Sequence, residues 1–192
     1  MRIGTWMAAV LACAGCGGAS SGGSTTPTPS AVASASQFVE AIDVAHAGHA
    51  EALVFEVEID DQSHPGFIEV EYWEGTGAHE VFIDPGTMAV VAEGPDTSEP
   101  EEQEERATVH AHLRDGRGDL RAAFGAGLLS SHDAAAVQEV ELTILEGHYV
   151  IAVELLRDGA RTTLYHAIDG TYLGTAEETL AHYAALPGQG HD

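Results

Sequence analysis

Leu53-Val54-Phe55-Glu56-Val57-Glu58-Ile59 is the stretch of sequence that decides the fold. Apolar and acidic residues alternate along it, which predicts a β-strand whose apolar face consists of Leu53, Phe55, Val57 and Ile59. Three further strands are expected after it, separated by turns that contain Gly or Pro, at 67–73, 79–83 and 88–92. A helix is expected before it, at 37–42. The first half of the chain is therefore predicted to be an α+β unit, with a helix packed on a small antiparallel sheet.

The second half of the chain repeats this order of elements. A short helix is expected at 120–124, strands at 137–142, 149–156 and 162–168, and a terminal helix at 175–186. Glu56-Val57-Glu58-Ile59 matches Glu139-Val140-Glu141-Leu142 at an offset of 83 residues. We therefore predict an internal duplication, with a first domain at 37–93, an acidic linker that can start a helix at 94–117, and a second domain at 118–192. A chance pairing of two α+β units is the alternative.

The N-terminus has the order of a bacterial lipoprotein signal. A basic residue and a short apolar stretch are followed by small residues and by both cysteines of the chain. We expect a signal peptide at 1–16 and a lipidated cysteine, with Cys16 favoured over Cys13. Residues 17–36 are rich in Ser, Gly, Thr and Pro and are expected to form a tether. The predicted location is the bacterial cell envelope, lipid-anchored, in the periplasm or at the cell surface. An ordinary cleaved signal is the alternative.

The chain carries 31 Asp and Glu residues against 7 Arg and no Lys, which gives a formal charge of −24. This charge repels nucleic acids and anionic membrane surfaces, and so argues against both as partners. In the first predicted sheet, glutamates alternate with apolar residues and are expected to share the outward face. We predict that a cationic protein or peptide segment binds this face, through Glu56, Glu58, Glu69, Glu71 and Glu80. A solvated face that keeps the protein soluble is the alternative.

Histidine is the second residue type in excess, with 11 copies. His46 and His49 are three positions apart, and His110 and His112 form a His-x-His pair. At helical spacing, residues three apart lie on one side, so such a pair can present two imidazoles to one ion. Imidazoles with carboxylates nearby bind zinc, copper or nickel. A periplasmic metal-binding protein is therefore the alternative function.

The sequence contains no motif of an enzyme active site. Gly-x-Ser-x-Gly and His-Glu-x-x-His are absent, and Ser130-Ser131-His132-Asp133 is contiguous, so that it cannot form a triad by itself. No Gly-rich phosphate-binding loop occurs either. We therefore expect a protein without catalytic activity and without a cofactor, either a binding module or a purely structural surface lipoprotein.

The order of a helix and three antiparallel strands, with a hydrophobic-Asp-turn signature near the end, resembles the PepSY domain family. The first unit carries the resemblance in 66–72 and in His79-Glu80-Val81-Phe82-Ile83-Asp84-Pro85-Gly86-Thr87. It covers about residues 37–93 and, more faintly, 118–175, although Gly86-Thr87 reverses the Thr-Gly order usual in the family. The resemblance implies two cystatin-like units and a role in peptidase inhibition or regulation, with a protein or peptide as partner. It implies no catalytic residue.

Overall fold

A computed structural model gives the structure of residues 35–61, 63–97, 100–113, 120–132 and 137–186. The predicted signal peptide, with Cys13 and Cys16, and nearly all of the predicted tether lie outside these ranges. Lipidation and the tether therefore stay predictions. Among the helices within the described ranges, none combines the length and the apolar character that crossing a membrane requires.

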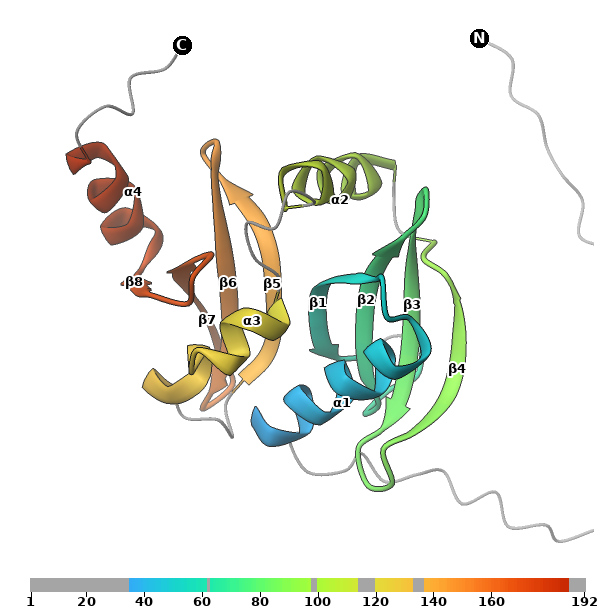
Figure 1. Ribbon diagram of the computed structural model, residues 1–192. Helices are drawn as coiled ribbons and strands as arrows, with labels where there is room; N and C mark the ends of the chain where they lie inside the picture. The colour runs from blue at the N-terminus through green and yellow to red at the C-terminus, as the bar shows by residue number, and fades with distance from the viewer. Residues whose placement is uncertain (1–34, 62, 98–99, 114–119, 133–136, 187–192) are drawn as a thin grey trace, which may run out of the picture.

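The described strands form one antiparallel sheet of eight strands, in the order β4-β3-β2-β1-β5-β6-β7-β8 (Figure 1). The first half of the chain supplies β1 (Leu53–Ile59), β2 (Ile68–Glu74), β3 (Gly77–Asp84) and β4 (Ala89–Pro95). The second half supplies β5 (Val137–Leu145), β6 (His148–Arg157), β7 (Ala160–Ala167) and β8 (Tyr172–Gly174). The helices are α1 (Ala35–Gly48), α2 (Pro100–Leu113), α3 (Leu120–Gly125) and α4 (Ala176–Ala185), with a 3₁₀ turn η1 at Leu128–Ser131. Every helix and strand that the sequence predicts is present, whereas β8 and η1 were not predicted.

A bulge in β1 interrupts the alternation that the sequence predicts. Val54 lies opposite Tyr72 and Glu56 lies opposite Glu71, which leaves Phe55 as the extra residue. Since facing residues of an antiparallel pair share a face, Leu53 lies on the face opposite to Val57, and the predicted apolar stripe of β1 is wrong at this end. Beyond the bulge, the alternation holds to the end of the strand.

The two faces of the sheet are covered by different helices. α1 and α3 lie on one face (Figure 1), where Phe38 of α1 and Leu120 of α3 belong to one buried core with Val57 and Val140 of the two central strands. α2 reaches the other face, since its Arg106 contacts a carboxylate of β2 that alternates with the core-facing residues of that strand. The site described below lies between this second face and α2.

The α+β prediction is confirmed, and both halves contribute to one sheet and one core. β1 pairs with β5, with Val57 directly opposite Val140, and the strand order is symmetric about this pair. The offset of 83 residues in the sequence match also aligns Val57 with Val140. The helix expected in the linker is also present, as α2. The duplication and the division into two cystatin-like domains stay predictions.

Candidate functional site

Eight glutamates lie in two neighbouring rows across one face of the sheet, which we call the acidic face. The strand register places Glu80, Glu71, Glu56 and Glu141 opposite one another in the first row, and Glu69, Glu58, Glu139 and Glu154 in the second. Facing residues of antiparallel strands have Cβ atoms about 4.5–5.5 Å apart, so like charges meet along both rows. The sequence analysis named five of the eight. The other three come from the second half and join the face because β1 pairs with β5.

The expectation that the carboxylates point into open solvent is wrong for three of the five predicted residues. Glu56, Glu69 and Glu71 are only 8%, 7% and 6% exposed. α2 lies against this face, where Glu105 accepts hydrogen bonds from the Thr143 hydroxyl at 2.6 Å and from the backbone amide of Ile144 at 3.2 Å. Strand alternation predicts which face a side chain is on, but it does not predict that a helix covers that face.

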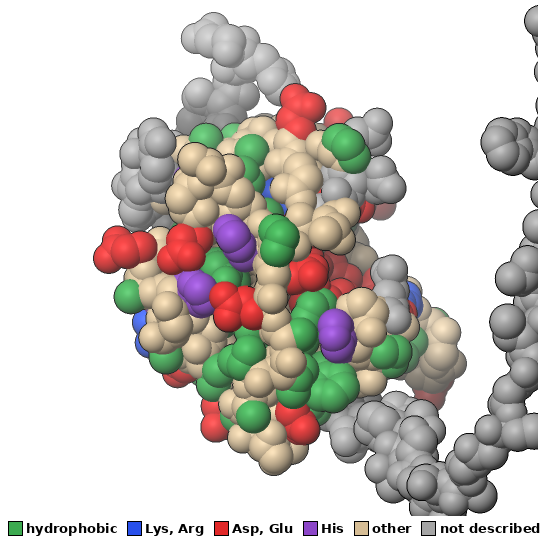
Figure 2. Space-filling view, turned by 90° about the vertical axis from the view of Figure 1, so that its right-hand side faces the viewer, with side chains coloured by type: hydrophobic (Ala, Val, Ile, Leu, Met, Phe, Trp, Pro, Cys, Tyr) green, Lys and Arg blue, Asp and Glu red, His purple; other side chains and the backbone are tan. Residues whose placement is uncertain are grey.

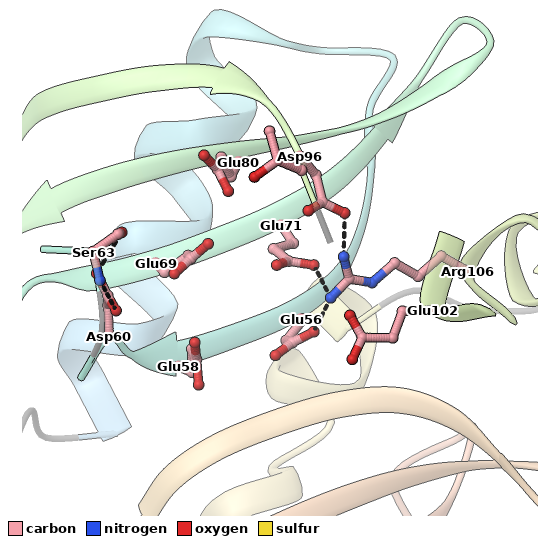
Figure 3. A pocket seen from close by; sticks show the side chains of 11 residues that line it. Glu56, Glu58, Asp60, Ser63, Glu69, Glu71, Glu80, Asp96, Glu102 and Arg106 are labelled. Carbon is pink, nitrogen blue, oxygen red and sulfur yellow. Dashed lines mark hydrogen bonds and ion pairs between the residues drawn. The ribbon is translucent and has the colours of Figure 1, made fainter. Parts of the chain in front are cut away.

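Arg106 of α2 pairs with three carboxylates at one end of the acidic face. Its Nη2 atom lies 2.6 Å from Glu71 Oε2 and 3.2 Å from Glu56 Oε2, and its Nη1 atom contacts Asp96 Oδ2 (Figure 3). The guanidinium also lies 5.1 Å from the centre of the Phe55 ring, within the range of a cation–π contact. We call Arg106, Glu56, Glu71 and Asp96 the closed end of the acidic face. The sequence analysis did not predict that Arg106 pairs with these carboxylates, although Arg106 is the first arginine of the chain after Arg2.

Glu58, Asp60, Glu69 and Glu80 line an open cavity of about 490 Å³, to which the closed-end residues also contribute (Figure 3). We call Glu58, Glu69 and Glu80 the open end. Ligand oxygens of Glu69, Glu71 and Glu80 all lie within 4.8 Å of one another. No arginine of the described residues forms an ion pair with an open-end carboxylate. In Figure 2, which faces the β4 side, acidic side chains gather at the surface with few basic ones among them.

Asp60 closes the far wall of the cavity and is held by its own turn. Its carboxylate accepts hydrogen bonds from the Ser63 amide at 3.1 Å and the Ser63 hydroxyl at 2.9 Å, and from the His64 amide. An aspartate that caps the following turn in this way is a common local motif. Asp60 is therefore a structural residue of the wall, in contrast to the open-end glutamates.

Burial and mutual repulsion raise the pKa values of the open-end carboxyls. Burial, followed by the charge of Glu56, raises the pKa of Glu58 to about 8. Burial, followed by the charge of Glu80, raises the pKa of Glu69 to about 8. At the closed end, burial also raises the pKa of Glu56 and Glu71, and Arg106 opposes the rise in both. The open end therefore holds protons near neutral pH and would exchange them for a cation.

The histidines of the two pairs that the sequence singles out belong to no group of three or more close metal ligands among the described residues, and metal binding by them stays a prediction. His49 lies between two carboxylates, with Nδ1 3.0 Å from Glu74 Oε2 and Nε2 2.9 Å from Glu93 Oε1. The rings of His110 and His112 stack on different aromatic rings, those of Trp73 and Tyr149 respectively. Among the described residues, the only group of three or more close ligand atoms is the carboxylate group around Glu69, and it includes neither His46 nor any other histidine. The members of each pair are close in the sequence, but the rings of His49, His110 and His112 contact different residues in the fold.

No protein-family model and no curated protein matches the chain. The chain is similar in structure to a candidate lipoprotein from Clostridium difficile 630, whose crystal structure aligns with a TM-score of 0.40 at 16% sequence identity. This alignment covers 69% of the present chain and 87% of the other.

Proposed function

We propose that the protein is a lipid-anchored binding module of the bacterial cell envelope, built from two PepSY-like units, whose acidic cavity binds a basic side chain of a partner protein or peptide. The residues around Cys13 and Cys16, which have the order of a bacterial lipoprotein signal, support the lipid anchor. The PepSY resemblance of the sequence supports inhibition or regulation of a peptidase as the outcome of binding. The acidic face supports the proposal that a basic side chain binds.

The single observation behind the proposal is the contrast between the two ends of the acidic face. Arg106 shows that carboxylates on this face accept a guanidinium group at hydrogen-bonding distance. Glu58, Glu69 and Glu80 line the same cavity and offer the same chemistry, and no arginine of the described residues forms an ion pair with them. Guanidinium groups bind carboxylates through several directed hydrogen bonds, so an arginine of a partner fits the open end better than a lysine does.

The net charge of the chain favours the same type of partner. A formal charge of −24 attracts cationic segments over a distance before contact, and this steering weakens as salt concentration rises. An entering guanidinium would displace the protons held by the open-end carboxyls. Binding is therefore expected to release protons near neutral pH.

The test is calorimetric titration of the protein with a hexa-arginine peptide. The variant Glu58→Gln/Glu69→Gln/Glu80→Gln keeps the shapes of the side chains and removes the open-end carboxyl groups, which ionise when a guanidinium binds. A control variant, Glu40→Gln/Glu51→Gln/Glu146→Gln, removes the same number of charges at exposed positions away from the cavity. We expect the open-end variant to bind at least about tenfold more weakly, a loss of about 1.4 kcal/mol, and the control variant to bind nearly as the wild type does. Equal losses in both variants would show that only the net charge matters and would refute the site.

A further inference from the structure

Two histidines outside the acidic face share one hydrogen bond in the second half of the molecule. His166 of β7 is fully buried, and His132 follows η1. Their Nε2 atoms are 2.7 Å apart, although the residues are 34 positions apart in the sequence. The ring of Tyr172 packs against both imidazoles, with centroids 5.7 Å from His132 and 5.3 Å from His166.

The hydrogen-bond partners fix where the protons of this pair sit. His166 Nδ1 lies 3.0 Å from the carbonyl oxygen of Gly170, and a carbonyl oxygen only accepts hydrogen bonds. Nδ1 therefore carries the proton, and Nε2 of the neutral His166 ring presents a lone pair. It follows that His132 Nε2–H donates to His166 Nε2. The Gly170 carbonyl is itself held in a tight turn, in which the Gly170 amide donates to the Ala167 carbonyl at 2.8 Å.

The geometry points to a transition-metal site at His132 and His166, with Zn²⁺ as the best-suited ion. Metal-binding imidazoles in proteins commonly donate the second ring nitrogen to a backbone carbonyl, which fixes the ring orientation and the lone pair, and His166 has this arrangement. For a metal ion to bind both Nε2 atoms, the proton of His132 would move from Nε2 to Nδ1, which frees the second lone pair and keeps the ring neutral. Nitrogen donors favour zinc or copper over calcium or magnesium.

The pair needs only a small movement to accept the ion. Two Zn–N bonds of about 2.0–2.1 Å at a tetrahedral angle place their nitrogens about 3.3 Å apart, compared with 2.7 Å in the hydrogen bond. His132 is the less buried of the two and can supply the shift. Burial lowers the pKa of both histidines, and His166 and Arg157 lower that of His132 further, which favours the neutral form of the rings. Water or an outside ligand would fill the remaining two positions.

The test is titration of the full-length protein with ZnCl₂, followed by NMR of the imidazole nitrogens and by calorimetry. We expect one ion to shift the ring signals of both His132 and His166, and to be lost when the pH falls from about 7.5 to about 5.5 as protons compete for the rings. Replacement of the partly exposed ligand, His132→Ala, should weaken this site at least about tenfold. NMR detects metal binding at His166 without a substitution of this fully buried residue.

A matched control uses an exposed histidine on α4. His182→Ala should leave the affinity and the ring shifts of His132 and His166 unchanged. The proposal is overturned if micromolar zinc leaves both ring signals in place, or if His132→Ala and His182→Ala weaken binding to the same extent. The proposal does not depend on the acidic cavity, because zinc bound only by carboxylates leaves both ring signals unchanged.

Discussion

The closed and open ends of the acidic face both contain glutamates of β1 and β2, but only the closed end contains an arginine. Glu56 and Glu58 are two positions apart on β1, and Glu69 and Glu71 are two positions apart on β2. All four line the cavity, but only one member of each pair contacts Arg106, and the other has no arginine partner among the described residues. The comparison teaches that the role of a carboxylate here is set by α2 and not by the strand pattern. At the closed end the carboxylates hold a helix, and at the open end they are available to a ligand.

Removal of the cation at the closed end should cause the largest effect. Arg106→Met keeps the length of the side chain but leaves Glu56, Glu71 and Asp96 buried without their cation. Breaking a buried ion pair from one side costs about 3–5 kcal/mol, so we expect a loss of this size in the free energy of unfolding at pH 7. Urea denaturation measures it. A loss below about 1 kcal/mol would show that the closed end does not hold α2 against the sheet.

The pH dependence of stability should show the effect of the open end. Glu58 and Glu69 have pKa values of about 8 in the folded protein, above the value of 4.5 that applies when they are unperturbed. Between these limits the folded state binds more protons than the unfolded state, so stability is highest at the acidic end and falls as the pH rises toward 8. We expect the free energy of unfolding to fall by about 1–3 kcal/mol between about pH 5 and about pH 8.

The variant Glu58→Gln/Glu69→Gln provides the control for this pH effect. It removes two of the carboxyls with raised pKa values, and should therefore reduce the fall in stability, while Glu56 and Glu71 continue to contribute to it. If the wild type instead became more stable between about pH 5 and about pH 8, the open-end carboxyls would be ionised and solvated, and the comparison between the two ends would not hold.

The smallest effect is expected at a second arginine on the same face. Arg161 contacts Glu154 and Asp61, but its side chain is 57% exposed, whereas that of Arg106 is 12% exposed. Exposed ion pairs contribute at most about 1 kcal/mol, so Arg161→Met should change the free energy of unfolding by less than this amount. Urea denaturation in parallel with the Arg106 variant provides the comparison. Equal losses in the two variants would mean that burial does not distinguish the closed end.

The sequence was sufficient to predict local structure because the relevant signals are local. Alternation defines β1 at Leu53–Ile59, and Asp158-Gly159 forms the tight turn between β6 and β7, where both residues have positive φ angles. The terminal helix was also predicted from its capping pattern, and Thr175 and Glu178 form the capping box. Each of these features depends on residues within a few positions of one another.

The features that were not predicted depend on contacts between distant residues. Arg106 meets Glu56 across 50 positions, and His132 meets His166 across 34. No spacing rule connects such residues, because the first contact depends on the position of α2 and the second on the position of the end of η1 against β7. For the same reason, the sequence placed the glutamates on the correct face but did not predict their burial.

The most direct test of the binding site is the pKa of Glu69, measured by NMR of its side-chain carboxyl carbon with and without hexa-arginine. Glu69 is 7% exposed, and burial together with Glu80 raises its pKa to about 8 in the free protein. A guanidinium bound at the open end would favour the ionised form, so the account predicts that the pKa falls by at least about one unit when the peptide is present. An unchanged pKa of Glu69 in the peptide-bound protein would contradict the account.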